Sequence, residues 1–220
     1  DDMISQACDH VTCGNLVPHW TDILVDEFQD ISEPRARLVK ALRDSRNGTS
    51  IFCVGDDWQA IYRFTGSDVA LTTGFEQHFG PTQTTSLDKT FRFNSSICDI
   101  ASQFVMQNPA QVKKRITTHD TVTEPAVSIV RRSLTSDDQS RPIYDILEKI
   151  SADADPGISV YLLARYWFIL PERDDLKRMQ EAFPALKIDV LTLHASKGKE
   201  ADYVVLLGLD NSKHGFPSHR

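Results

Sequence analysis

The chain has 220 residues, of which 40% are hydrophobic and 25% are charged, with ten glycines and ten prolines. This length and composition predict one or two globular domains, and they exclude an intrinsically disordered or fibrous protein. No segment approaches the run of about 18 apolar residues that a membrane helix needs, and the start DDMISQACDH is not a signal peptide. We therefore expect a soluble cytoplasmic protein. Its four widely spaced cysteines predict neither a zinc site nor a disulfide framework.

The net charge of −7 is unevenly distributed along the chain. Residues 1–85 contain six Lys and Arg against thirteen Asp and Glu, whereas residues 86–220 contain eighteen of each kind. A protein that binds nucleic acid through charge alone needs a basic excess, so the composition argues against that class. An acidic first part fits a site for a magnesium–nucleotide complex as well as it fits an ordinary solvated surface.

Short apolar runs rich in β-branched residues alternate with helical patterns. In chain order we expect a strand at residues 23–25, a helix from Ser32, a strand at 51–54, a weaker strand at 84–87, a helix from Asn94, a weaker strand at 127–130, a strand at 160–163, a weaker strand at 190–193 and a strand at 204–207. The strongest runs predict buried strands. The alternation predicts an α/β fold with mostly parallel sheets covered by helices. Turn residues at 79–85 predict a boundary there, because the charge balance changes at the same place.

Acidic residues follow the first two predicted strands. Asp26 and Glu27 come directly after the first, and Gly55, Asp56 and Asp57 after the second. Ligands of open parallel sheets bind at the carboxyl ends of strands, so we expect the two acidic ends to be neighbours that face one crevice. There Asp26 can hold Mg²⁺ beside nucleotide phosphates, and Glu27 can polarise an attacking water molecule. For Asp26 and Glu27 alone, a simple turn after a strand is the alternative.

Further candidates follow the second acidic end. Gln59 is a neutral donor and acceptor that suits contact with a terminal phosphate. Tyr62 and Phe64 flank Arg63 and are typical of a platform on which unpaired bases stack. Packing in a core is the alternative for these two aromatic side chains.

Four motifs in this order resemble those of the UvrD/Rep-like superfamily 1 DNA helicases. VDEFQD at residues 25–30 resembles motif II of that family, and VGDDWQAIYRFTG at 54–66 resembles motif III. LDKTFRFNSSI at 87–97 is similar to motif IV, and VLTLHASKGKE at 190–200 to motif V, with a Gly-Phe-Pro turn at 215–217. The Asp-Trp-Gln and Phe-Arg-Phe-Asn variants, and the short distance between motifs IV and V, are most similar to the bacterial DNA helicase IV branch.

The resemblance implies RecA-like parallel sheets of the P-loop NTPase class. Residues 1–85 correspond to the C-terminal part of a first motor domain, and residues 86–220 to most of a second. It also implies a catalytic site for ATP and Mg²⁺. In that site Asp26 matches the magnesium ligand, Glu27 the residue that activates water, and Gln59 the γ-phosphate sensor. Arg92 matches the arginine that reaches the γ-phosphate from the second motor domain, where its planar charge stabilises the transferring phosphoryl group.

The other carried-over positions contact the nucleotide or the DNA. Phe91 matches an aromatic residue that lies on the adenine, and Glu200 matches the residue that holds the ribose. Four residues match positions that contact single-stranded DNA, namely Tyr62, Phe64, Thr192 and His194. Phe64 stands where Trp is commoner and Phe91 where Tyr is commoner, and both keep an aromatic face for stacking. Thr65 stands where many relatives carry Arg, which puts one contact in doubt.

Two motifs of the family are missing from these 220 residues. There is no G-x-x-x-x-G-K-[ST] phosphate loop, and the chain stops at Arg220 before the arginine-containing motif VI. Since the chain also begins without Met, we expect it to be a piece of a longer protein. By itself it is expected neither to hydrolyse ATP nor to unwind DNA, because the groups that cradle the phosphates are lacking.

For the full-length protein the resemblance implies a nucleoid-associated motor that moves 3′ to 5′ on single-stranded DNA and unwinds duplexes. Its partners would be single-stranded DNA, duplex junctions and proteins of DNA repair or recombination, with no membrane. One alternative is a degenerate helicase-like module that binds DNA or protein without ATPase activity. Another keeps the enzyme but changes the substrate to RNA, or couples the helicase to a nuclease in recombination.

Overall fold

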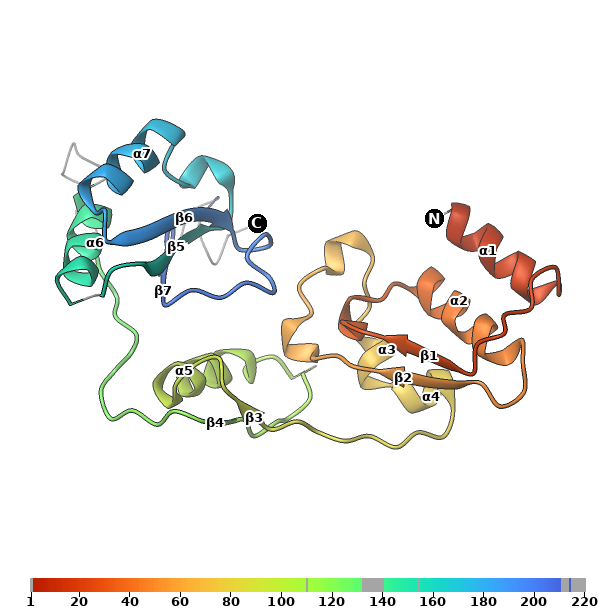
Figure 1. The fold of residues 1–220 in the computed structure, drawn as a ribbon. Helices are drawn as coiled ribbons and strands as arrows, with labels where there is room; N and C mark the ends of the chain where they lie inside the picture. The colour runs from red at the N-terminus through yellow and green to blue at the C-terminus, as the bar shows by residue number, and fades with distance from the viewer. Residues whose placement is uncertain (1, 110, 132–140, 154, 211–213, 215–220) are drawn as a thin grey trace. The chain divides into compact units, whose positions relative to one another are not determined.

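A computed structural model describes residues 2–109, 111–131, 141–153, 155–210 and 214. The chain divides after Val127 into two compact units, each of which is described by itself below (Figure 1). Both units contain parallel strands and α-helices, which confirms the predicted α/β class. The predicted boundary at residue 85 concerns two motor domains and stays a prediction. The Gly-Phe-Pro sequence at 215–217 lies outside the described residues.

The first unit begins with two helices and two parallel strands. Helix α1 (Asp2–Thr12) packs against α2 (Glu33–Asp44), and β1 (Asp22–Val25) pairs with β2 (Ser50–Cys53). The helix expected at Ser32 is confirmed, with Ser32 in extended conformation as its N-cap and a proline in the first turn. The Ser32 side chain makes no capping hydrogen bond, so the proline is the clearer start signal.

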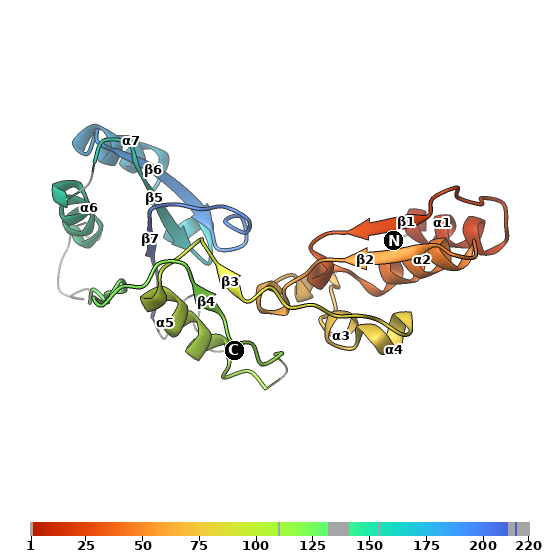
Figure 2. The same cartoon turned by 60° about the horizontal axis from the view of Figure 1, so that its bottom comes forward.

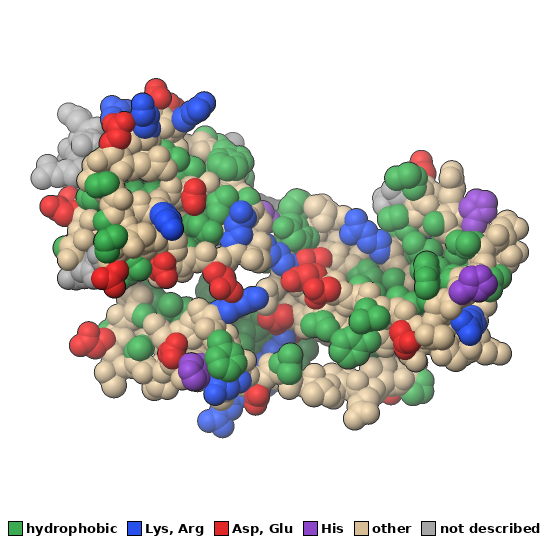
Figure 3. Space-filling view, viewed as in Figure 1, with side chains coloured by type: hydrophobic (Ala, Val, Ile, Leu, Met, Phe, Trp, Pro, Cys, Tyr) green, Lys and Arg blue, Asp and Glu red, His purple; other side chains and the backbone are tan. Residues whose placement is uncertain are grey.

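One face of the β1–β2 pair is buried. Val25, Ile51 and Cys53 pack against a core of five buried residues, which are Phe28, Ile31, Ala36, Leu71 and Phe79. The opposite face carries Leu24 and Phe52, which are 74% and 63% exposed, and hydrophobic side chains are visible on the surface of this unit (Figure 3). The expectation that these two strands are wholly buried is therefore wrong for the described residues, because side chains alternate across a strand and only one face is covered.

Short elements complete the first unit. Helices α3 (Ala70–Thr73) and α4 (Phe75–Phe79) follow the acidic segment after β2. They contribute Leu71 and Phe79 to the core of the first unit. Strand β3 (Lys89–Thr90) pairs in parallel with β4 (Thr117–Thr118), and α5 (Ser95–Val105) lies along them in both views (Figures 1 and 2). Asn94 caps α5 as predicted, because its side chain accepts the Ile97 N–H at 3.1 Å. The weaker strands expected at 84–87 and 127–130 are wrong, since neither segment is in a strand.

The second unit is a three-stranded parallel sheet with helices packed on it. The strand order is β6 (Leu186–Thr192), β5 (Ile158–Ala164), β7 (Tyr203–Leu206), so all three strands expected after residue 157 are present. Helices α6 (Arg141–Asp153) and α7 (Arg173–Ala182) supply Leu147 and Met179 to a core shared with Val160, Leu162, Leu186 and Ile188. Central β5 is the most buried strand, which explains its unbroken apolar sequence.

Within the described residues, four short 3₁₀ helices connect these elements, at Phe28–Asp30, Asp57–Gln59, Arg63–Thr65 and Trp167–Ile169. Three of them lie directly after β1 or in the segment after β2, where the sequence places its candidate catalytic residues. None of the helices in the described part of the chain has the length and apolar character to cross a membrane.

Candidate functional site

The ends of β1 and β2 are joined by backbone hydrogen bonds. The Val54 N–H donates to the Val25 carbonyl at 2.9 Å, and the Phe28 N–H donates back to the Val54 carbonyl at 2.9 Å. The two acidic segments that follow therefore leave the sheet side by side, which confirms the expected neighbourhood. Acidic side chains gather where β1 and β2 end in the space-filling view (Figure 3).

Glu27 has an unusual backbone. Its φ of 50° places it in the left-handed region, and among the described residues it is the one non-glycine residue with a positive φ. The Asp26 carboxylate holds this turn, because its Oδ1 accepts the Glu27 N–H at 2.8 Å. Non-glycine residues adopt this conformation at an energetic cost, and such strain concentrates at functional sites. Both carboxylates are exposed at the end of β1.

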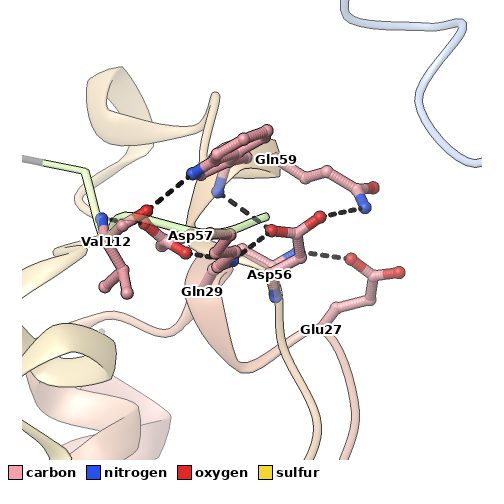
Figure 4. A network of polar contacts seen from close by, with 8 residues as sticks. Glu27, Gln29, Asp56, Asp57, Gln59 and Val112 are labelled. Carbon is pink, nitrogen blue, oxygen red and sulfur yellow. Dashed lines mark hydrogen bonds and ion pairs between the residues drawn. The ribbon is translucent and has the colours of Figure 1, made fainter. Parts of the chain in front are cut away.

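Gln29 connects the two acidic segments (Figure 4). Its Nε2 donates to Glu27 Oε2 at 2.5 Å, and its Oε1 accepts the Asp56 N–H at 2.9 Å. Gln29 is only 1% exposed, so both ends of its amide are used within the protein. Gly55 makes room for it, because a Cβ there would lie 2.9 Å from Gln29 Oε1 and 3.1 Å from Gln29 N. Gln29 was not among the predicted site residues, although its polar side chain two positions after Glu27 was the available signal.

Asp56 connects this network to Gln59. Asp56 Oδ2 accepts a hydrogen bond from Gln59 Nε2 at 2.8 Å, and Oδ1 accepts the Trp58 N–H at 3.1 Å. Oδ1 also lies 2.6 Å from Lys114 Nζ. Partial burial opposes ionisation, but the hydrogen bonds from Lys114 and Gln59 and the lysine charge together lower the pKa of Asp56 below its ordinary value. The carboxylate is therefore charged at neutral pH and holds the Gln59 amide by an ionic acceptor.

Lys114 was not among the predicted site residues. Its ammonium pairs with both Asp56 and Asp57, and it lies 5.7 Å from the centre of the Trp58 ring. Although partial burial disfavours the charged form, the hydrogen bonds and charges of the two aspartates raise the pKa of Lys114 above its ordinary value. The basic run at residues 113–115 was the sequence signal, but its partner lies more than fifty positions earlier in the chain.

The aromatic pair expected to stack on bases lies in the segment after Gln59. Phe64 is 70% exposed, whereas Tyr62 is half-buried, and the two ring centres are 6.1 Å apart. Core packing, the alternative for these side chains, does not describe Phe64. The Thr65 hydroxyl donates to the Tyr62 carbonyl at 2.8 Å, so Thr65 closes the turn that presents Phe64.

Phe91 and Arg92 follow β3 and are both exposed, Phe91 by 68%. The Phe91 ring centre lies 5.0 Å from that of His119 and 5.3 Å from Lys89 Nζ. The Arg92 N–H donates to Thr90 Oγ1 at 3.3 Å. A flat aromatic face is thus presented at the end of this strand pair beside a cation.

The remaining predicted residues lie in the second unit, at and after the end of β6. Thr192 ends the strand, and its hydroxyl accepts the Ala195 N–H at 3.2 Å while its carbonyl accepts the Ser196 N–H at 3.0 Å. His194 and Glu200 are exposed on the turn that follows. Thr192 therefore shapes this turn, and the assignment of the ten residues to a nucleotide site and to a DNA-binding site stays a prediction.

Comparisons with known proteins agree on one family. Residues 4–80 match the family described as the UvrD/REP helicase N-terminal domain. The chain is 42% identical to DNA helicase IV of Escherichia coli K12 over 216 residues. This aligned region covers 98% of this chain and 30% of that protein. The chain belongs to the UvrD/Rep-like family of superfamily 1 helicases. This confirms the resemblance on which the motif assignments rest.

Other UvrD-like relatives match shorter parts of the chain. ATP-dependent DNA helicase UvrD1 of Mycobacterium tuberculosis H37Rv is 33% identical over 101 residues, covering 44% of this chain and 13% of that protein. DNA helicase II of Salmonella typhimurium is 32% identical over 106 residues, covering 48% of this chain and 14% of that protein. The chain spans less than a third of the length of each of these three relatives.

The end of β1 in this UvrD-like chain presents carboxylates, which are oxygen ligands of the kind that Mg²⁺ prefers. An open depression of about 360 Å³ lies there, and its lining includes Asp26, Glu27, Asp30 and Arg35. Within the described residues no three His, Cys, Asp or Glu side chains gather as a complete metal site. Mg²⁺ keeps several water ligands and binds through one or two carboxylates together with substrate phosphates, so the exposed Asp26 carboxylate is compatible with this mode of binding.

Proposed function

We propose that the full-length protein containing this chain is an ATP-dependent DNA helicase. It would couple ATP hydrolysis to 3′-to-5′ movement on single-stranded DNA and to unwinding of duplex DNA. Residues 1–85 would supply the C-terminal part of the first motor domain, and residues 86–220 most of the second. The observation that carries the proposal is the continuous polar network from Glu27 through Gln29 and Asp56 to Gln59.

That network suits the activation of a water molecule beside a phosphate. Glu27 would accept the proton of the attacking water, and the Gln29 amide, donating to Glu27 Oε2, orients the carboxylate for this task. Asp26 would hold Mg²⁺, which when bound neutralises phosphate charge. Gln59, held by Asp56, would contact the γ-phosphate, and its displacement on hydrolysis would pass along the same hydrogen bonds.

Other residues would bind the two substrates. Phe91 would lie on the adenine and Arg92 would stabilise the γ-phosphate charge, while Glu200 would hold the ribose. Exposed Phe64, supported by Tyr62, would stack on a base of single-stranded DNA. Thr192 and His194 would contact the DNA backbone, which suits residues on a turn at a strand end.

The 220-residue chain alone is proposed to lack ATP turnover, because its sequence contains no phosphate loop. The deciding experiment therefore uses the full-length protein. ATP turnover is measured with and without single-stranded DNA for the wild type and for Glu27→Gln, together with binding of a fluorescent ATP analogue. We expect DNA to stimulate ATP turnover strongly in the wild type. In Glu27→Gln the DNA-stimulated turnover should be lower by about a hundredfold or more, while the ATP analogue still binds.

Two results would contradict the proposal. Turnover that is undiminished in Glu27→Gln would remove Glu27 from the mechanism. A wild-type protein that binds DNA but shows no turnover would favour the degenerate binding module instead. Comparing single-stranded RNA with DNA as the stimulating polymer then tests the choice of substrate.

A further inference from the structure

The segment that follows α5 contacts the acidic end of β2 at several points. The Val112 N–H donates to Asp57 Oδ2 at 2.8 Å, and Trp58 Nε1 donates to the Val112 carbonyl at 3.0 Å (Figure 4). Two residues further on, Lys114 forms its ion pairs with Asp56 and Asp57. The Val112 backbone and the Lys114 side chain thus both contact the turn at residues 56–58.

The two aspartates have different roles in this contact. The Asp57 side chain is only 3% exposed, and a carboxylate so deeply buried is costly unless a cation and hydrogen-bond donors compensate its charge. Val112 and Lys114 supply both kinds of partner. Asp57 is therefore the anchor that fixes Lys114 in place.

Asp56 transmits the position of Lys114. One carboxylate oxygen of Asp56 receives the Lys114 ammonium, and the other receives the Gln59 amide. A carboxylate is rigid and planar, so fixing one oxygen restricts the direction of the other. Loss of the lysine would remove the short contact at Oδ1 and leave only the longer hydrogen bond from the Trp58 N–H there, so the Asp56 carboxylate would be less restricted about its side-chain bonds.

We propose that Lys114 is a positioning residue for Gln59, acting through Asp56. Lys114 belongs to the segment after α5, and Gln59 belongs to the turn after β2. Because both side chains contact Asp56, the position of the Gln59 amide would depend on where residues 112–114 lie. This inference rests on the proposed ATPase function, because it assigns Lys114 an effect on the phosphate contact of Gln59. Lys114 itself touches neither reactant and so is not a catalytic residue.

The test compares substitutions of adjacent lysines in the full-length protein. Lys114→Met removes the charge but keeps most of the side-chain length, and Lys114→Arg keeps the charge. Lys113→Met is the matched control, because Lys113 is exposed and directly precedes Lys114 in the same segment. The kcat and KM for ATP are measured with saturating single-stranded DNA for each variant.

We expect Lys114→Met to lower kcat by about tenfold or more with a KM for ATP within twofold of wild type, since misplacing a group by a fraction of an ångström is costly. Lys114→Arg should restore at least half of kcat, and Lys113→Met should match the wild type. The decisive measurement repeats Lys114→Met in a Gln59→Ala background. If Lys114 acts through Gln59, the lysine substitution has no further effect there.

Several results would overturn the inference. A Lys114→Met protein with wild-type kcat would do so, and so would an equal fold loss in the wild-type and Gln59→Ala backgrounds. If Lys114→Met does not fold, judged by circular dichroism, Lys114→Gln replaces it, because that change removes the charge but leaves an amide that can donate and keeps the Asp56 contact with Gln59. An absence of ATP turnover in the wild type would instead refute the proposed function, and the inference with it.

Discussion

Gln29 accepts the Asp56 N–H at 2.9 Å and thereby ties the turn after β1 to the turn after β2. Gln29 itself is 1% exposed, its hydrogen bond to Asp56 is part-buried, and the other end of its amide orients Glu27. Two acidic segments that would repel each other are therefore held together by a neutral amide. An amide suits this place because it donates to one segment and accepts from the other.

Substitution of Gln29 separates these two functions. Gln29→Ala should lower the free energy of unfolding by about 1 kcal/mol, because the Asp56 N–H loses its acceptor in a part-buried hydrogen bond. Gln29→Glu keeps an acceptor for Asp56 but places a second carboxylate against Glu27. Hydrogen exchange of the Asp56 amide should accelerate in Gln29→Ala and change much less in Gln29→Glu. Equal protection of this amide in wild type and Gln29→Ala would contradict this tie.

Gly55 should not tolerate a side chain. Gly55→Ala places a methyl group 2.9 Å from Gln29 Oε1 and 3.1 Å from Gln29 N, closer than van der Waals contact allows. We expect a loss of about 1 to 3 kcal/mol in the free energy of unfolding, measured by urea titration. In a Gln29→Ala background part of the crowding is gone, so the same change should cost less. An equal cost in both backgrounds would place the strain elsewhere.

The contact between Asp56 and Lys114 should contribute stability over a wide but bounded pH range. The pKa of Asp56 is lowered from 3.8, so its contribution is present above about pH 3.8 and is lost as the pH falls through the folded-state pKa. The pKa of Lys114 is raised from 10.5, so its contribution is present below about pH 10.5 and is lost as the pH rises through the folded-state pKa.

The measurement is the difference in unfolding free energy between wild type and Lys114→Met across the pH range. That difference should be constant from about pH 5 to pH 9 and should shrink below about pH 3.8, whereas Lys113→Met should show no such dependence. A difference that grows as the solution becomes acidic would have the wrong sign for this ion pair.

Phe64 should contribute directly to binding of single-stranded DNA by the full-length protein. Stacking on a base contributes about 1 to 3 kcal/mol to binding, so Phe64→Ala should raise the Kd for single-stranded DNA by roughly 5- to 150-fold. Phe64→Trp should bind at least as well as wild type, because it keeps an aromatic face. Fluorescence anisotropy with a labelled oligothymidine measures both, and Leu87→Ala, an exposed apolar change at 91% exposure, is the control. Unchanged binding by Phe64→Ala would remove this residue from the DNA site.

Local patterns in the sequence were sufficient for the elements with strong signals. The alternation of apolar runs and helical periodicity predicted the α/β class, five of the strands and the helix starts at Ser32 and Asn94. These features depend on residues close together in the chain, where a cap or an apolar run acts without distant partners. The strands expected at 84–87 and 127–130 failed because an apolar run forms a strand only where a neighbouring strand supplies hydrogen bonds.

The order and spacing of the acidic, amide and aromatic residues identify the family, and they therefore indicate which residues could serve a UvrD-like site. How these residues are held became visible only in three dimensions. The Gln29 tie and the Lys114 ion pair depend on segments that are far apart in the chain and meet only when β1 pairs with β2 and residues 112–114 dock on the turn. Such contacts leave no local periodicity, because the energy that selects them arises only after the chain has brought opposite charges and buried polar groups together.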